Sequence, residues 1–240
     1  MIRGLDASAA QGPLPYSKLD PTIRFVILKA QQGNDGFDPW FARNMRAALT
    51  AGLVPFAYCF AYPLPEKPGL RIAGTISGRG PRDQAKLCVD RVHAFPEMID
   101  RPIMLDLEWP PPNEWAKWGC TAKQISEWCR DFAAAVAELS GATPVLYTYP
   151  WWWAAVSQEA DTSWAAAYPL WMAAYTTGGK WPAEDDAPPI PKPWDDWLLW
   201  QFDGDGGMKL PNGADADFCV FNGDEAALAA LATPPLPPAA

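Results

Sequence analysis

The sequence predicts a single α/β domain in which eight strands close into a TIM-like barrel. Short strand-like runs alternate with helix-like runs, which is typical of a parallel sheet covered by helices. Eight strand-like runs can be counted, and eight strands close such a barrel. Neither an internal repeat nor a linker divides the 240 residues, and hydrophobic residues make up 49% of them, enough for a large core.

The first part of the chain shows the clearest alternation of strand and helix. The helix predicted at 38–52 has Asp38 as a candidate cap, and Thr121 with Gln124 forms a capping box at the start of another helix. Both helices carry apolar residues at helical spacing. Strands are expected at 2–8, 25–33, 53–62, 101–110 and 144–150, and helices at 38–52, about 81–98 and 121–141.

The spacing between strands shortens after residue 150. Further strands are expected at 169–175, 197–203 and 216–223, with fewer full helices between them. A final helix at about 223–232, with Asn222 as a candidate cap, completes a predicted barrel domain of residues 1–232. Residues 233–240 form a Pro/Ala-rich tail.

The charge of the chain limits its partners. A net charge of −9 argues against nucleic acids and anionic membranes, because like charges repel. No apolar run approaches the length of a membrane span, and the first twelve residues lack the apolar region of a signal peptide. We therefore expect no nucleic-acid partner, no membrane partner and synthesis into the cytoplasm, and we expect a monomer.

Cysteine and histidine usage narrows the chemistry. The five cysteines are scattered and odd in number, which favours reduced core thiols over a disulfide framework. The one histidine, His93, lies in a helical pattern, so a structural role is favoured. Histidine-rich metal sites are excluded, and a Ser-His-Asp triad would depend on that residue alone. We expect no metal and no other cofactor, and chemistry that rests on carboxylates, tyrosines or lysines.

Two carboxylates interrupt the apolar run MLDLEW at residues 104–109. In a strand Met104, Asp106 and Glu108 share one face, so both carboxylates would point into the barrel at the carboxyl end of the strand. Their Cα atoms would lie about 6.5–7 Å apart. Like charges this close raise one pKa, so that one group can act as a general acid, as in glycoside hydrolysis. The alternative is a solvated pair at a strand end.

Polar and aromatic side chains also occur at the ends of other predicted strands. Each alone has an ordinary explanation: Lys29 can be a surface ion-pair partner and Asp217 a turn residue. Their common position indicates one rim of the barrel. Aromatic faces stack on sugar rings, although most of the 14 tryptophans are expected in the core. The candidate rim residues are Asp6, Lys29, Gln31, Tyr147, Gln201 and Asp217, with Trp109, Trp171 and Trp200 as the best-placed tryptophans.

Several motifs together resemble family 25 of the glycoside hydrolases, the Chalaropsis-type lysozymes. They occur in family order, cover about residues 2–223 and are far more specific in combination than an Asp-x-Glu pair. The matching segments are GLDASAAQG (4–12), FVILKAQQG (25–33), AGLVPFAYCF (51–60), PIMLDLEW (102–109), PVLYTY (144–149), LWMAAY (170–175) and ADFCVFNG (216–223).

The resemblance implies a (β/α)5β3 barrel that lacks some outer helices, and a muramidase that acts on peptidoglycan. By match to the family motif, Glu108 is the general acid and Asp106 the second catalytic carboxylate. Asp106 would act either as nucleophile or by stabilising an intermediate formed by the acetamido group of the substrate. The resemblance further assigns Asp6 and Asp217 to the other acidic positions of the active site, and Tyr58 and Tyr147 to the groove tyrosines.

The chain departs from the family pattern in three places. The common Tyr-His-Phe of the family is Tyr58-Cys59-Phe60 here, so a role of that histidine is lost. The Pro/Gly-rich loop at 63–80 and the insertion at 110–119 are unusual, and either can reshape a substrate groove.

Three functions are consistent with the sequence. The leading hypothesis is a retaining muramidase, for which the missing signal peptide favours a phage endolysin held in the host cytoplasm until its release to the cell wall. The alternative origin of such a muramidase is a bacterial autolysin or toxin exported by another route. The second is a non-catalytic wall-binding barrel, against which the Asp106 and Glu108 pair argues. The third is a glycosidase that acts on another amino-sugar polymer, such as chitin.

Overall fold

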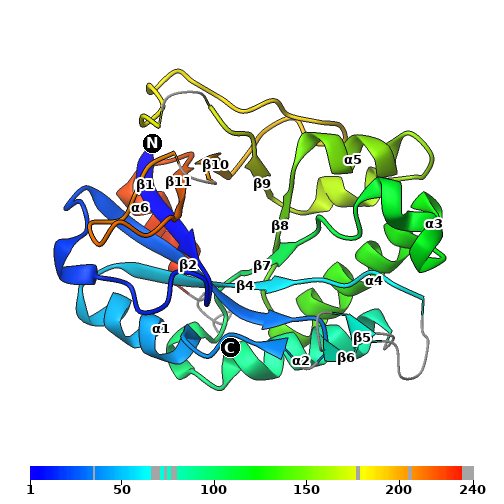
Figure 1. The fold of residues 1–240 in the computed structure, drawn as a ribbon, viewed down its shortest axis with the longest axis horizontal. Helices are drawn as coiled ribbons and strands as arrows, with labels where there is room; N and C mark the ends of the chain where they lie inside the picture. Colours follow the sequence, from blue (N-terminus) through cyan, green and yellow to red (C-terminus); the bar gives the residue numbers. More distant parts are fainter. Residues whose placement is uncertain are drawn as a thin grey trace, which may run out of the picture.

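The computed structural model describes residues 1–34, 36–65, 71–72, 75–76, 80–176, 179–204 and 207–233. Within them, eight strands close into a barrel because β1 pairs with both β2 and β11 (Figure 1). The barrel strands, in order around it, are β1 (Ile2–Ala7), β2 (Ile23–Gln32), β4 (Val54–Phe60), β7 (Ile103–Asp106), β8 (Val145–Thr148), β9 (Leu170–Ala173), β10 (Leu199–Asp203) and β11 (Asp217–Phe221). The predicted TIM-like barrel is confirmed.

Short strands complete the sheet structure of the described residues. β3 (Gly36–Phe37) pairs with the end of β2, while β5 (Arg71–Ile72) and β6 (Thr75–Ile76) pair only with each other. The predicted tail at 233–240 lies outside the described residues apart from Thr233, and so does much of the loop at 63–80.

The direction of β11 differs from that of every other barrel strand. Neighbouring strands from β1 through β2, β4, β7, β8 and β9 to β10 are parallel, whereas β11 is antiparallel to both β10 and β1. The first residues of β11 therefore lie at the same rim as the last residues of the other strands. This is the rim at which barrel enzymes carry their active sites.

The helical layer is thick over one half of the barrel and thin over the other (Figure 1). Long helices follow β2, β4 and β7, a shorter one follows β8, and among the described residues none lies between β9 and β11. The helices are α1 (Phe41–Thr50), α2 (Pro81–His93), α3 (Trp115–Trp118), α4 (Ala122–Ser140), α5 (Pro150–Ser157) and α6 (Glu225–Ala232), with 3-10 turns η1 (Tyr16–Lys18), η2 (Pro96–Met98), η3 (Pro112–Glu114) and η4 (Ser163–Ala167).

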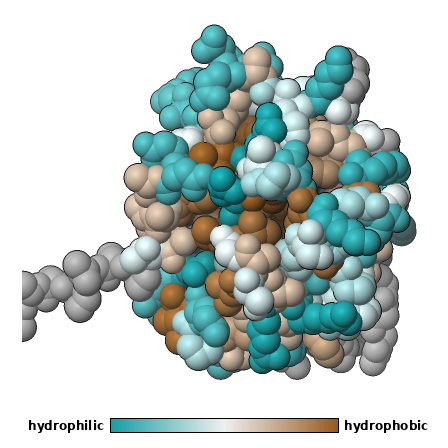
Figure 2. Space-filling model, turned by 90° about the vertical axis from the view of Figure 1, so that its left-hand side faces the viewer, coloured by the Kyte–Doolittle hydropathy of each residue, from teal (hydrophilic) through white to brown (hydrophobic). Residues whose placement is uncertain are grey.

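Alternation along the strands separates two apolar layers. Phe25, Ile27 and Phe56 belong to a cluster inside the barrel, while Val26 and Leu28 belong to the larger layer between the sheet and the helices. Leu228 of α6 packs with the inner cluster, so this helix covers the barrel end at which β11 finishes. The core accounts for the high apolar content, and on the face shown in Figure 2 apolar side chains are visible in recessed positions among hydrophilic ones.

The structure corrects two predicted helix starts. α1 begins at Phe41, and Asp38 instead accepts hydrogen bonds from the backbone N–H groups of Trp40 (2.8 Å) and Ala9. Asp38 therefore connects the loop after β1 to the loop before α1. In α6 the cap is Asp224 rather than Asn222, because its side chain accepts from the N–H of Ala227.

Other helix ends agree with the sequence pattern. The capping box of Thr121 and Gln124 is present, and Gly141 ends α4 in the left-handed conformation. α2 ends at His93, earlier than expected, and Pro96 begins a separate 3-10 turn. A proline in a helix interior lacks the N–H that the helix needs, which explains the early end.

Candidate active site

Four carboxylates meet at the carboxyl-terminal rim of the barrel. Asp106 ends β7 and Glu108 follows two residues later, while Asp6 of β1 lies directly opposite Asp217 in the antiparallel pairing with β11. The sequence predicted all four residues. Asp217 is at the start of β11, and it lies beside the ends of the other strands because β11 runs in the opposite direction. The negative charges of Asp6 and Asp217 repel each other, as do those of Asp106 and Glu108.

Burial and mutual repulsion change the acidity of this group. Burial raises the pKa of Asp106 well above its usual value, the charge of Glu108 raises it further, and Lys29 partly opposes both. Burial and then Asp217 likewise raise the pKa of Asp6, although hydrogen bonds from Gln201 and Cys219 oppose the rise. Asp106 is 6% exposed, and its Oδ1 atom has no hydrogen-bond partner among the described residues. These two aspartic acids therefore keep their protons to higher pH than ordinary ones.

A hydrogen-bonded chain supports Asp6 from below the rim. The amide nitrogen of Gln201 donates to Asp6 Oδ2 (2.8 Å), and the Sγ atom of Cys219 donates to the same oxygen (3.3 Å). The Oε1 atom of Gln201 accepts from the hydroxyls of Tyr147 (2.9 Å) and Tyr175 (3.1 Å). Gln201, predicted as a rim residue, therefore fixes two tyrosines and one carboxylate relative to each other.

Lys29 supplies positive charge beside the carboxylates. Its Nζ atom lies 4.9 Å from the ring centroid of Phe60 and 5.8 Å from that of Tyr58. Burial lowers the pKa of Lys29, while Asp106, Asp38 and Glu108 favour its charged form. Tyr58 is itself buried, and burial with the nearby carboxylates raises its pKa well above the usual value, so its hydroxyl remains a donor. Both predicted residues lie at the site.

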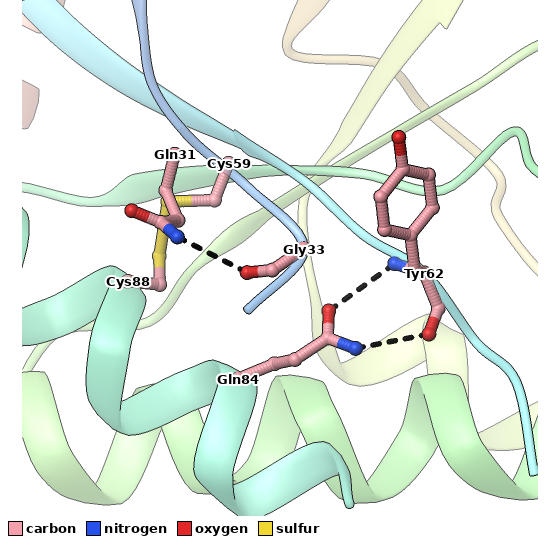
Figure 3. The surroundings of a disulfide bond; sticks show 6 residues. All are labelled: Gln31, Gly33, Cys59, Tyr62, Gln84 and Cys88. Atoms are coloured by element: carbon pink, nitrogen blue, oxygen red, sulfur yellow. Dashed lines mark hydrogen bonds between the residues drawn. A yellow bond between two sulfur atoms is a disulfide. The ribbon is translucent and has the colours of Figure 1, made fainter. Parts of the chain in front are cut away.

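Gln31 does not reach the site, contrary to the prediction. A bulge between Lys29 and Gln31 shifts the register, so that Gln31 lies opposite Cys59 instead of sharing the face of Lys29. Its side chain is 3% exposed and donates to the carbonyl of Gly33 (3.2 Å), close to Cys59 and Cys88 (Figure 3). The neighbouring Gln32 instead lines a hollow together with Lys29 and donates to the hydroxyl of Tyr62 (2.5 Å).

The prediction of five reduced thiols is also wrong. Cys59 of β4 and Cys88 of α2 form a disulfide with a sequence separation of 29 (Figure 3). Beside it, the amide of Gln84 bonds to both the N–H (3.2 Å) and the carbonyl (3.0 Å) of Tyr62. The other cysteines, Cys120, Cys129 and Cys219, are free and buried. Helix α2 is thus fixed covalently and by hydrogen bonds to the strand that carries Tyr58.

We expect reduction of this disulfide to lower the free energy of unfolding by roughly 3–4 kcal/mol, because the bond closes a loop of about thirty residues. Chemical denaturation with and without dithiothreitol measures the effect in the wild type and in the double variant Cys59→Ala/Cys88→Ala. The double variant should not respond to the reductant, whereas Cys120→Ala should respond like the wild type. Equal stability of the wild type in both buffers would contradict the assignment.

The predicted tryptophans occupy three different surroundings. Trp171 lies in the inner cluster, 4.6 Å from Tyr147 between ring centroids. Trp109 packs against Tyr62 at 4.9 Å, beside the segment that carries Glu108. Trp200 alternates with the inward Leu199 and Gln201, so it faces the outer layer. There its indole donates to the carbonyl of Ala174 (2.8 Å). The structure therefore places Trp200 outside the carboxylate cluster, contrary to the prediction.

Two hollows are lined by residues of this site. One of about 430 Å³ is lined by Glu108, Tyr147 and side chains from α5 and the end of β9. The other, of about 290 Å³, is lined by Lys29, Gln32 and residues after β1 and around β3. One hollow therefore offers a ligand direct access to Glu108, and the other offers access to Lys29.

Sequence reasoning missed Tyr175 as a site residue. It follows Trp171 and Ala173 at alternate positions, and both of these face the barrel interior. The same alternation that identified Trp171 would have found it. Trp151, which was not among the predicted site residues, has 56% of its surface exposed.

The described residues contain no helix that is both long and apolar enough to cross a bilayer. Within the same residues, no group of three or more histidine, cysteine, aspartate or glutamate side chains has the arrangement of a metal site.

Comparison with known proteins agrees with this geometry. The model of the glycosyl hydrolases family 25 matches residues 5–209. Lysozyme M1 of Streptomyces globisporus is 29% identical over 238 residues, which cover 96% of this chain and 71% of that protein. The N,O-diacetylmuramidase of Chalaropsis sp is 28% identical over 165 residues, 67% of this chain and 72% of that protein.

Solved structures share the whole fold. A muramidase from Trichobolus zukalii has a TM-score of 0.73 at 27% identity, and the match covers 97% of this chain and 99% of that one. A bacterial lysozyme from Streptomyces coelicolor has the same TM-score, 0.73, at 25% identity, with 96% of each chain covered.

Proposed function

Because this chain belongs to the glycosyl hydrolases family 25, we propose that it is a muramidase. It hydrolyses the β-1,4 bond between N-acetylmuramic acid and N-acetylglucosamine in peptidoglycan. The observation that carries the proposal is the set of four carboxylates, Asp6, Asp106, Glu108 and Asp217, at one rim of the barrel beside an open cleft. The lysozymes and muramidases among its relatives support the choice of substrate.

Glu108 is assigned as the general acid because it lines the cleft, whereas Asp106 is buried beneath it. A general acid must reach the oxygen of the bond that breaks, and it must hold a proton near neutral pH. The mutual repulsion of Asp106 and Glu108 makes it unfavourable for both to be charged at once, so the pair holds a proton to higher pH than separate carboxylates do. Glu108 thus gives its proton to the leaving oxygen and later takes one from the attacking water.

Asp106 is assigned as the second catalytic carboxylate. From beneath the bond it either attacks the anomeric carbon or orients the acetamido group that forms the intermediate. Net retention is part of the proposal, because retaining enzymes hold their two carboxyl groups close together. Asp6, held by Gln201, and Asp217 place two further acidic side chains beside the sugar on which positive charge develops.

The proposed function is tested by digestion of purified peptidoglycan and mass spectrometry of the released fragments. We expect fragments with N-acetylmuramic acid at the reducing end. Fragments that end in N-acetylglucosamine, or release of sugars from chitin at a comparable rate, would identify a different glycosidase. A complete lack of fragments would favour the non-catalytic wall-binding barrel, which the retained carboxylate cluster and cleft argue against.

The proposal includes a role as a phage endolysin that acts as a monomer. Expression inside a susceptible bacterium should then leave the culture turbid until a separate pore-forming protein opens the membrane. Light scattering should give a mass near 26.3 kDa. Lysis without the pore, or a larger mass, would contradict these parts of the proposal and leave the activity itself standing.

A further inference from the structure

Three consecutive tryptophans open helix α5, and they divide into two roles. Trp152 and Trp153 are buried, with 0% and 1% of their surfaces exposed, whereas Trp151 is 56% exposed. The ring of Trp151 is nearly parallel to that of Tyr149, with an interplanar angle of 17° and 6.2 Å between centroids. The large apolar surface of Trp151 is thus open to solvent, while the two tryptophans that follow it are anchored in the core.

This pair of rings forms part of the wall of the larger hollow beside the carboxylates. The hollow measures about 430 Å³, and its lining includes Glu108, Tyr147, Tyr149, Trp151, Ala173 and Tyr175. Glu108 is the one carboxylate among its lining residues in the described structure. Tyr175, which is 53% exposed, is the fourth aromatic side chain in this lining, after Tyr147, Tyr149 and Trp151.

Hydrogen bonds fix this wall relative to the catalytic groups. The indole of Trp152 donates to the carbonyl of Pro110 (3.0 Å), two residues beyond Glu108, and the indole of Trp115 donates to the same oxygen (2.9 Å). The hydroxyl of Tyr175 donates to Gln201 (3.1 Å). The start of α5 is therefore held against the segment that carries the acid, as a preorganised binding surface requires.

We propose that this hollow binds the leaving amino sugar, with Tyr149 and Trp151 stacked on its apolar face. This inference rests on the proposed function. When the bond breaks, positive charge develops on the sugar that keeps the anomeric carbon, so that sugar lies over Asp6 and Asp106. The sugar on the other side of the bond contacts Glu108 but not Asp6 or Asp106. A ligand in this hollow has the same contacts, because Glu108 lines the hollow and the two aspartates do not.

The reaction balances with this assignment. The bond between the anomeric carbon and the oxygen breaks, and the oxygen keeps the electron pair and takes the proton of Glu108. The sugar in the hollow then departs as an alcohol. Water adds its oxygen to the anomeric carbon and returns a proton to Glu108, so the enzyme is restored.

The test compares two substrates that share the retained sugars and differ in the leaving group. The first is a glycan oligomer of alternating N-acetylglucosamine and N-acetylmuramic acid, and the second is the disaccharide N-acetylglucosaminyl-N-acetylmuramyl fluoride, whose leaving group is fluoride. We expect Trp151→Ala to lower kcat/KM for the oligomer about tenfold, the equivalent of about 1.4 kcal/mol, which ring stacking can supply. Its kcat/KM for the fluoride should equal that of the wild type.

Trp151→Phe, which keeps an aromatic face, serves as the matched control and should recover most of the oligomer activity. An equal loss on both substrates would overturn the inference, since Trp151 would then act on the retained sugar or on the fold. Unchanged cleavage of the oligomer by Trp151→Ala would overturn it as well. If the wild type cleaves neither substrate, the proposed function itself fails. This result differs from an equal loss in Trp151→Ala on both substrates and from unchanged cleavage of the oligomer.

Discussion

Replacing Glu108 by glutamine should reduce the rate of peptidoglycan cleavage by about 10²–10⁴-fold, the usual contribution of a positioned general acid. Glutamine keeps the size and shape of the side chain, but it cannot supply a proton to the leaving oxygen. The rate of appearance of new reducing ends measures the effect. Circular dichroism and the unfolding temperature should remain close to those of the wild type, because Glu108 borders the cleft and is not buried in the core.

A matched control lies just before the start of the same strand. Glu97, in the 3-10 turn before β7, is exposed. It precedes the amino-terminal end of the strand, whereas Glu108 follows the carboxyl-terminal end. Glu97→Gln removes the same charge from the same type of residue, so it should leave the rate unchanged. A Glu108→Gln variant that keeps half of the wild-type rate would remove Glu108 as the acid.

Replacing Asp106 by asparagine should lower the cleavage rate by a similar factor and raise stability at neutral pH. Burial, and then the charge of Glu108, raises the pKa of Asp106, so the folded state binds this proton more tightly than the unfolded state. Below about pH 4, the usual value for an unfolded aspartate, both states are protonated and the residue carries no penalty. As the pH rises toward and through the pKa of the folded state, the free energy of unfolding of the wild type falls, because Asp106 must become a buried charge. Asparagine does not ionise and avoids this loss.

Denaturant unfolding at acid and neutral pH measures this second effect. The free energy of unfolding of Asp106→Asn should match the wild type near pH 4 and exceed it by about 1–3 kcal/mol at pH 7–8. Leu107→Ala provides a comparison with a different pH profile: the residue faces the helical layer and is fully buried, so the variant should lose stability at every pH. If Asp106→Asn is less stable than the wild type at neutral pH, the carboxylate of Asp106 stabilises the fold and the prediction is wrong.

The alternation of side chains on regular strands made the barrel and most of its site predictable. Asp6, Asp106 and Tyr147 lie where a period of two places them, and the inward position of Met104 confirms the face assigned to Asp106. Asp217 was located at the start of its strand, but its meeting with Asp6 depends on a reversed strand direction. Local sequence does not encode that direction, because it is decided by how the sheet closes.

The failures share a physical cause, which is that they depend on departures from regular strands or on contacts distant in sequence. Gln31 turned away because one extra residue in β2 changed the face of everything after it. Trp200 and Gln201 were both assigned to the rim, although alternation places adjacent strand residues on opposite faces. The link between Cys59 and Cys88 joins a strand to a helix packed against it, and an odd cysteine count gave no sign of the pair.

The cross-link between β4 and α2 has a consequence for how the protein matures. Glutathione keeps thiols reduced in the bacterial cytosol, whereas the space outside the inner membrane is oxidising. Under the proposed role as an endolysin held in the host cytoplasm, a new molecule would begin as the dithiol form and gain its covalent tie after release to the cell wall. Recombinant yield and shelf life should accordingly depend on whether the host strain oxidises or reduces its thiols.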